Sequence, residues 1–282
     1  MAATSHISRP GSTHLEATVI LRFWHLISLD APTVAVVWVS AFAWANQVVL
    51  PWWVPAILAL GSWSVYVGDR LLDALSARTA LQARHHFNWR HRRVLAPMAL
   101  FAFVAAICLA IVYVPAAARV RNTALAAAAC LYFIAVHRPE KKSRSSLKLP
   151  KEALVGILFT LACVLPVWAR TELNPLELVL PTFLFTLLAW LNCHLIDRWE
   201  STVPQRNVLQ STLALSGVFL VAAILFGSFH QPRLAALLGA GAAGSFGLGI
   251  LDLVASRLAP ITLRAAADLV LLSPAILLTL TR

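Results

Sequence analysis

The sequence predicts an all-α protein, a polytopic membrane helix bundle of nine transmembrane helices in a single domain. Of the 282 residues, 60% are hydrophobic and the mean hydropathy is +0.77, values typical of a membrane protein and not of a soluble domain. The apolar residues also fall in runs of about 20, the length that a helix needs to cross a bilayer. Because backbone in hydrocarbon must satisfy its own hydrogen bonds, we expect each run to be helical.

Nine apolar runs define the expected spans. They cover residues 24–48, 52–74, 94–115, 120–137, 152–169, 177–197, 208–228, 233–255 and 264–281. Prolines fall mostly near the ends of these runs, where a helix tolerates them. We expect residues 1–20 to form a polar N-terminal tail without a cleavable signal peptide, and residues 24–281 to form the bundle.

The distribution of positive charge predicts the orientation. The net charge is +11, and 15 of the 23 lysines and arginines lie in the loops that follow spans two, four, six and eight. By the positive-inside rule these loops are cytoplasmic, which places the N-terminus in the cytoplasm and the C-terminus outside. We expect an integral protein of a bacterial inner membrane, whose positive charge meets lipid headgroups or an anionic substrate, and no nucleic-acid partner.

Two aspartates end the second span, where packing alone does not explain them. Asp69 and Asp73 are four residues apart, so both carboxylates project from one face of a helix. An ionised carboxylate in hydrocarbon costs several kcal/mol unless it is paired, hydrogen-bonded or bound to a metal. Two like charges side by side therefore predict a cation between them, and Mg²⁺ is the simplest candidate because hard cations take carboxylate oxygens.

A second acidic motif ends the sixth span. Residues 192–200 contain Asn192, Asp197 and Glu200, and they repeat the Asp-Arg pair of the first motif. Both motifs end even-numbered spans, so both should lie at the cytoplasmic side, as do the basic loops 76–93 and 138–151. A carboxylate cluster with a basic rim is suited to a diphosphate, because the metal bridges carboxylate and phosphate oxygens while arginine and lysine take the remaining charge.

These motifs carry a resemblance to a known family. Residues 65–73 align with the motif Asn-Asp-x-x-Asp-x-x-x-Asp and keep its last two aspartates, and residues 192–200 resemble the family's second motif. With nine spans, the chain resembles the UbiA superfamily of intramembrane prenyltransferases. Further similar stretches are residues 28–32, Arg78-Thr79, Tyr132, residues 137–138, 151–156 and 263–268. The chain departs from the pattern at Val65 and Tyr66, which replace asparagine and aspartate, and at Glu200, which is three and not four residues after Asp197.

The resemblance implies a UbiA-like fold and a Mg²⁺-dependent reaction that moves a polyprenyl group from polyprenyl diphosphate to a lipophilic acceptor of aromatic or quinone type. The expected catalytic residues and Mg²⁺ ligands are Asp69, Asp73 and Asp197, with Glu200 and Asn192 as additional ligands. The residues expected to hold the diphosphate are Arg78, Arg138, Lys148 and Lys151. The residues expected to line the pocket of the allylic cation are Tyr66, Tyr132 and Trp190.

Other functions fit the same residues. A terpene cyclase of this superfamily would ionise the same donor without an acceptor, and a transporter or non-catalytic membrane protein would release no diphosphate. Individual side chains also have structural interpretations. Arg70 and Arg198 could neutralise the neighbouring ligands, Asp30 could cap or join helices, and Asp252 and Asp268 could pair with Arg257 or Arg264. The histidines of the loop 76–93, namely His85, His86 and His91, are expected in a solvated loop.

Overall fold

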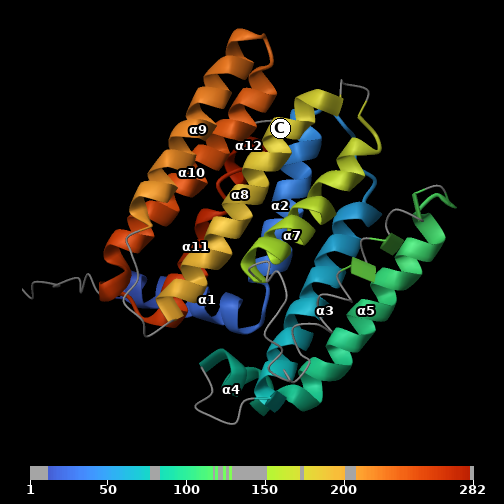
Figure 1. Cartoon of the computed structure of the whole chain (residues 1–282). Coiled ribbons are helices and arrows are strands. Elements are labelled where there is room, and N and C mark those ends of the chain that lie inside the picture. Colours follow the sequence, from blue (N-terminus) through green and yellow to red (C-terminus); the bar gives the residue numbers. More distant parts are fainter. Residues whose placement is uncertain are drawn as a thin grey trace, which may run out of the picture.

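Every element that the computed structural model describes is a helix, and most of the helices run side by side in a bundle (Figure 1). The structure describes residues 12–76, 83–116, 151–171, 175–200 and 208–279, together with positions 118–119, 123–124 and 127–128. No strand occurs within these residues. The prediction of an all-α fold is confirmed for this part of the chain.

Most of the helices overlap the predicted spans. In chain order they are α1 (Ser12–Leu26), α2 (Asp30–Ala45), α3 (Trp53–Ser76), α4 (Ala83–Arg90), α5 (Arg92–Tyr113), α7 (Lys151–Trp168), α8 (Pro175–Glu200), α9 (Leu209–Ser228), α10 (Pro232–Val254), the 3₁₀ turn η1 (Ala255–Arg257), α11 (Pro260–Val270) and α12 (Ala275–Thr279). The predicted span 120–137 lies almost wholly outside the described residues. The helix α4 occupies a segment for which we predicted a loop.

Several of these helices are long and apolar enough to cross a membrane. Four qualify by length and composition, namely Arg92–Tyr113, Leu176–Glu200, Leu209–Ser228 and Pro232–Arg257. The count reaches five if α2 and the end of α1 are taken as one broken span. These helices support an integral membrane protein, while the count among the described residues is below the nine spans predicted.

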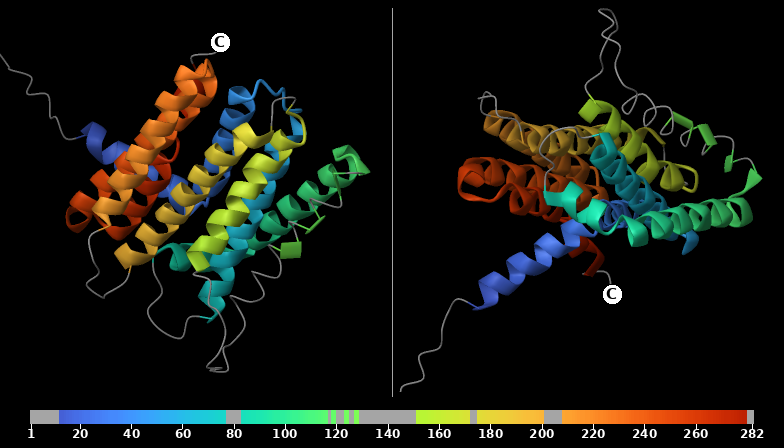
Figure 2. Two further views of the ribbon diagram at one scale, coloured as in Figure 1. Left: turned by 45° about the horizontal axis from the view of Figure 1, so that its top comes forward. Right: turned by 90° about the horizontal axis from the view of Figure 1, so that it is seen from below.

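The first predicted span is not one straight helix. Residues 24–48 are divided between α1 and α2, and Val19–Leu26 meets Asp30–Ala45 at 89°. Ser28, at the corner, has a φ of 64°, in the left-handed region. As a result α1 leaves the bundle sideways (Figure 2). The last predicted span is also divided, into α11 and α12, by a turn over residues 271–274.

The centre of the bundle is an aromatic and aliphatic core. Trp38 of α2 stacks on Phe185 of α8 with ring centroids 4.0 Å apart, and Phe42 lies 5.5 Å from Phe185. All three side chains are buried, and the indole N–H of Trp38 donates a hydrogen bond of 2.9 Å to the backbone oxygen of Leu271. This polar atom therefore has a partner inside the core, and the bond joins α2 to the end of α11.

The helices α9 and α10 pack closely through small residues. A side chain at Gly241 would overlap the buried ring of Phe219, and one at Gly249 would lie 2.7 Å from the hydroxyl of Thr212. Hydroxyl groups also cross the interface, because Ser216 donates to the oxygen of Ala242 at 3.0 Å. Small residues and interhelical hydrogen bonds are the usual basis of helix pairing in lipid.

This packing predicts that replacing two glycines of α10 by alanine changes the free energy of unfolding in opposite directions. Gly241→Ala should lower the free energy of unfolding by about 1–3 kcal/mol, because the methyl group meets the Phe219 ring and overpacks the interface. Gly239 is a matched control, since a methyl group added there would have no atom within 4 Å and alanine favours a helix by up to about 1 kcal/mol. Unfolding in mixed micelles titrated with SDS measures both changes. Equal effects at the two positions would contradict the packing described here.

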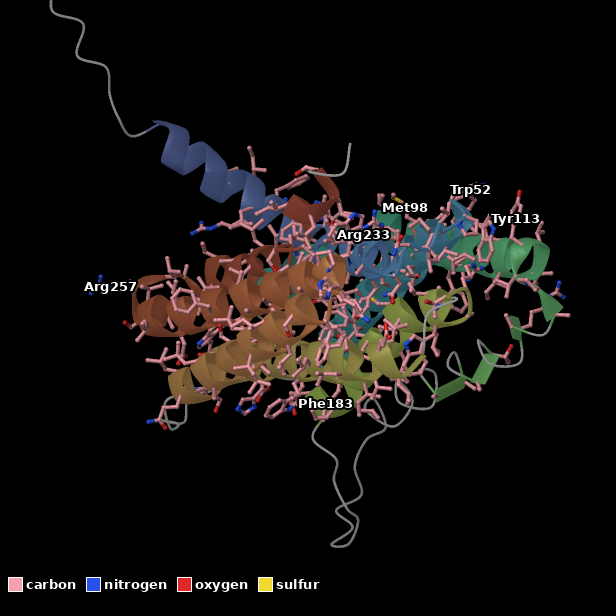
Figure 3. The ribbon with its side chains drawn as sticks, turned by 90° about the horizontal axis from the view of Figure 1, so that it is seen from above. Trp52, Met98, Tyr113, Phe183, Arg233 and Arg257 are labelled. Atoms are coloured by element: carbon pink, nitrogen blue, oxygen red, sulfur yellow. The ribbon has the colours of Figure 1, made fainter. Side chains whose placement is uncertain are left out.

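Aromatic residues gather at the end of the bundle where α2 joins α3. The exposed ring of Trp52 lies edge-on to that of Tyr113 at a centroid distance of 5.4 Å, and Figure 3 shows both at the periphery. Arg170 lies over Trp53 at 5.1 Å, and Arg233 lies over Trp44 at 5.7 Å. Amphipathic rings and arginines of this kind are typical of a membrane–water interface.

Candidate functional site

A group of buried and half-buried polar side chains lies where the corner between α1 and α2 meets α3, α8 and α11. We call this group the polar cluster. Its members are His25, Asp30, Tyr66, Arg70, Asn192, Glu200, Arg264 and Asp268. Charged side chains inside a membrane bundle are expensive and usually mark a functional site.

Arg70 holds the corner between α1 and α2. Its Nη1 donates to the backbone oxygen of His25 at 2.7 Å and to the hydroxyl of Ser28 at 2.9 Å. Its Nη2 lies 3.4 Å from Oδ2 of Asp30, and both side chains are almost completely buried. The guanidinium therefore adds a donor to the backbone at the end of α1 and balances an acid at the start of α2. Of the two roles expected for Asp30, capping a helix or joining helices, the contacts fit the second, because Asp30 joins α2 to α1 and α3.

Asp30 also binds His25. Oδ2 of Asp30 lies 2.5 Å from Nδ1 of His25, and both side chains are almost fully buried. The second carboxylate oxygen of Asp30, Oδ1, has no hydrogen-bond partner. The residue is thus held by His25 and Arg70, and its carboxylate also lies within hydrogen-bonding reach of the Asp268 carboxylate.

The opposite side of the polar cluster comes from α8 and α11. Nδ2 of Asn192 donates to Oδ1 of Asp268 at 3.3 Å, and both residues are buried. Arg264 donates to Oε1 of Glu200 at 2.6 Å and is hydrogen-bonded to the Tyr66 side chain. Arg70 in turn lies 4.6 Å from the centre of the Tyr66 ring. Tyr66 and Arg264 therefore connect α3 to α8 and α11.

The structure brings some of the predicted site residues into this cluster and leaves others outside. Tyr66, Asn192 and Glu200 are members. Asp69 and Asp73 are half-buried on α3 and Asp197 is exposed on α8. Within the described part of the chain, the only set of three or more potential metal ligands with atoms all within 4.8 Å of one another is His25, Asp30 and Asp268.

Of the remaining predicted site residues, the structure gives a side-chain contact for Trp190. Trp190 stacks on His194 at a centroid distance of 5.6 Å. Lys151 begins α7, but its side chain is not among those described. Outside the described residues lie Arg78, Tyr132, Arg138 and Lys148.

Arg198 and Asp252 have a different arrangement from the one that we expected. Arg198 of α8 lies 3.7 Å from Oδ2 of Asp252 on α10, and the indole N–H of Trp199 donates to Oδ1 of Asp252 at 3.0 Å. Asp252 thus pairs with residues of α8, whereas we had considered Arg257 or Arg264 as its partner. Asp268 does lie near Arg264, and it is also hydrogen-bonded to Asn192.

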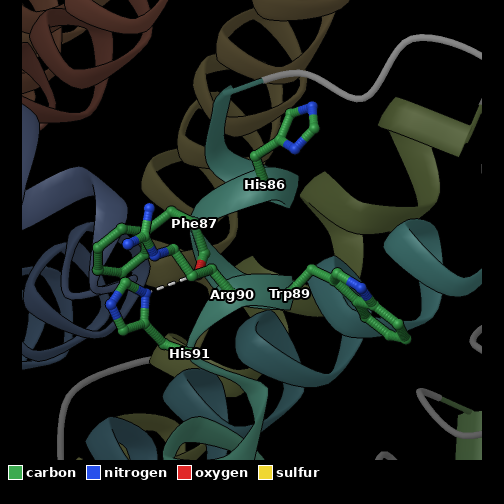
Figure 4. Close-up of a pocket in the computed structure, with 5 residues that line it drawn as sticks. All are labelled: His86, Phe87, Trp89, Arg90 and His91. Carbon is green, nitrogen blue, oxygen red and sulfur yellow. Dashed lines mark hydrogen bonds between the residues drawn. The ribbon is translucent and has the colours of Figure 1, made fainter.

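The histidines that we placed in a solvated loop lie on or next to α4. His86 and His91 line a shallow pocket together with Phe87, Trp89 and Arg90 (Figure 4). Nδ1 of His91 donates to the backbone oxygen of Phe87 at 2.8 Å. The prediction of a loop at this position is wrong, because residues 83–90 form a helix. The pocket has no acidic residue in its lining and resembles no metal site.

Sequence reasoning missed His25, Asp30, Arg264 and Asp268 as parts of one site. Each is a single polar residue near the end of an apolar run, and nothing in the spacing of the four shows that they meet. For Asp30 and Asp268 the available signal is that an acid near an apolar run is unusual in a chain that has only 12 Asp and Glu residues. Comparison with protein-family models, with curated proteins and with solved structures finds no match to this chain.

Proposed function

We propose that the chain is a Mg²⁺-dependent intramembrane prenyltransferase, with a divergent nine-span UbiA-like fold, that moves a polyprenyl group from its diphosphate to a lipophilic acceptor. In this proposal it lies in a bacterial inner membrane with a cytoplasmic N-terminus. The main observation in its favour is that the two acidic motifs end α3 and α8 at the same end of the bundle, beside the polar cluster (Figure 1).

The face of α3 supports this proposal. Tyr66, Asp69, Arg70 and Asp73 lie within about 100° of one another around the helix, because each residue advances about 100°. Tyr66 and Arg70 contact the polar cluster, so both aspartates lie on the face that borders it. This face therefore presents two carboxylates, a guanidinium and an aromatic ring to one region.

The distribution of acids over two helices suits a diphosphate. Asp69 and Asp73 would hold one ion from α3, and Asp197 would hold another from α8. Because a diphosphate has two phosphoryl groups, the two motifs need not touch each other to bind it. Bound Mg²⁺ would neutralise the charge that develops on the leaving diphosphate. The carboxylate oxygens of these residues are the donor type that Mg²⁺ prefers.

An apolar groove between α3 and α5 offers space for a prenyl chain. It is lined by Leu60, Trp63, Pro97, Met98, Phe101 and Ala102. Trp63 is three residues before Tyr66 and about 60° from it around α3, so the groove lies on the Tyr66 side of this helix. The Tyr66 ring, already beneath Arg70, offers a π-face to an allylic cation.

Diphosphate release tests the proposal. We expect the protein, purified in detergent, to release diphosphate from farnesyl or geranylgeranyl diphosphate with Mg²⁺ and a suitable acceptor, and to release none after EDTA treatment. A joined product identifies a transferase, whereas a cyclic product formed from the donor alone identifies a cyclase. No release with a panel of aromatic and quinone-type acceptors would overturn the proposal.

One observation favours a transporter as the second candidate. The first span is broken by 89° beside the buried Asp30, and broken helices with a charged residue at the break are typical of transporter binding sites. This candidate predicts ion-dependent uptake of a solute into proteoliposomes, with no chemical change of a prenyl diphosphate. The same protein preparation serves both assays.

A further inference from the structure

His25, Asp30 and Asp268 converge from three helices that are distant in the sequence. Each offers one potential ligand atom, and the three atoms all lie within 4.8 Å of one another. The residues are 1%, 0% and 7% exposed. Bonds of about 2.0–2.2 Å to a metal place its ligands roughly 3–4 Å apart, so only a small closure is needed for all three to share an ion.

Buried oxygens point to a ligand in the same place. Oδ1 of Asn192, whose amide nitrogen donates to Asp268, has no hydrogen-bond partner, and the carboxylates of Asp30 and Asp268 lie within hydrogen-bonding reach of each other. All three side chains are more than nine-tenths buried. Buried acceptors normally have partners, and two buried carboxylates in contact need a proton or a cation between them, so this group of oxygens fits a bound cation.

The charges favour a cation. The polar cluster contains the carboxylates of Asp30, Glu200 and Asp268 against the guanidinium groups of Arg70 and Arg264. Nη1 of Arg264 lies 2.6 Å from Oε1 of Glu200, so the charges of these two side chains balance each other. With a neutral His25, two ionised carboxylates would face the single charge of Arg70, and a divalent ion bound between them would balance the excess negative charge.

We propose that His25, Asp30 and Asp268 bind a divalent metal ion of the first transition row, with the amide oxygen of Asn192 as a further ligand. One imidazole and two carboxylates form a ligand set that suits Mn²⁺ or Fe²⁺. This site shares Asn192 with the second acidic motif but contains none of Asp69, Asp73 and Asp197, and it needs no diphosphate. The ion would tie the corner between α1 and α2 to α11, across the polar cluster.

Manganese binding tests the site directly. The full chain, purified in detergent and freed of metal, is titrated with Mn²⁺ alone, and free Mn²⁺ is followed by its EPR signal. We expect one bound Mn²⁺ per chain without any diphosphate. Pulsed EPR should show a ¹⁴N coupling from one imidazole. Absence of bound Mn²⁺, or bound Mn²⁺ without this coupling, would overturn the proposal.

Variants then assign the ligands. Asp268→Asn, which nearly preserves the shape of the side chain, should bind Mn²⁺ at least ten-fold more weakly, while the matched control Asp252→Asn should bind as the parent does. Asp69→Asn and Asp197→Asn should also retain this Mn²⁺, which separates the site from the proposed catalytic one. Parent-like binding by a folded Asp268→Asn protein would contradict the assignment. If that variant does not fold, the ¹⁴N coupling in the parent decides.

Discussion

Replacement of Arg70 by leucine should cause the largest loss of stability of any single change considered for this protein. The substitution leaves Asp30 buried without its guanidinium partner and removes the donor to Ser28 and to the backbone oxygen of His25. Breaking a buried ion pair by removing one partner costs about 3–5 kcal/mol. We expect Arg70→Leu to unfold in mixed micelles at a much lower SDS fraction than the parent.

Arg92 offers a matched control for this prediction. It is an exposed arginine that lies over the Trp89 ring at 4.3 Å, so its replacement by leucine should cost less than about 1 kcal/mol. The stability of Arg70→Lys should lie between that of the parent and that of Arg70→Leu, because lysine keeps the positive charge but not the planar set of N–H donors of arginine. If Arg70→Leu is as stable as Arg92→Leu, Arg70 does not hold the corner between α1 and α2.

Neutralisation of either acidic motif should cause the largest loss of activity. In the proposed reaction, Asp73→Asn and Asp197→Asn each remove a carboxylate that holds Mg²⁺ at the diphosphate. We expect each to lower kcat for diphosphate release at least 100-fold, which corresponds to about 2.7 kcal/mol of transition-state stabilisation. Steady-state assays at saturating donor and Mg²⁺ measure this effect.

Asp252→Asn is again the control for activity, because Asp252 pairs with Arg198 and Trp199 and belongs to neither motif. It should keep kcat within about three-fold of the parent, which corresponds to a change of under about 1 kcal/mol in the activation free energy. Loss of activity in one motif variant alone would contradict a site shared by both helices. Equal loss in Asp252→Asn would indicate a general effect on folding.

Hydropathy predicted most of the helices. The predicted spans 52–74, 208–228 and 233–255 differ from α3, α9 and α10 by no more than two residues at either end. These limits are predictable because apolar run length and flanking prolines depend on local sequence. The small residues of α10 are of the kind that favours close helix packing in a membrane, and Gly241 does lie against Phe219.

The break in the first span was not predictable in the same way. Residues 24–48 are continuously apolar apart from Ser28, Asp30 and a few other polar side chains, so hydropathy favours one helix. The corner depends on Arg70, which is more than 40 residues away and binds the open end of α1. Contacts at such sequence separation leave no periodic signal in a single sequence.

The polar cluster shows the same limit. A site at Asp69 and Asp73 could be predicted because their spacing of four residues is a local pattern in the sequence. Asp30 and Asp268 are 238 positions apart in the chain, and only the packing of α11 against α1 and α2 brings them together. Tyr66 was predicted as an aromatic wall, and the structure adds its bond to Arg264, which no local pattern contains.

The most direct test of the central claim is the binding of an unreactive donor, geranylgeranyl thiodiphosphate, by titration calorimetry with and without Mg²⁺. The proposed shared site predicts one analogue per chain, Mg²⁺-dependent binding, and at least ten-fold weaker binding in both Asp73→Asn and Asp197→Asn. If both variants bind the analogue as tightly as the parent, or if binding does not depend on Mg²⁺, the two motifs do not form a diphosphate site.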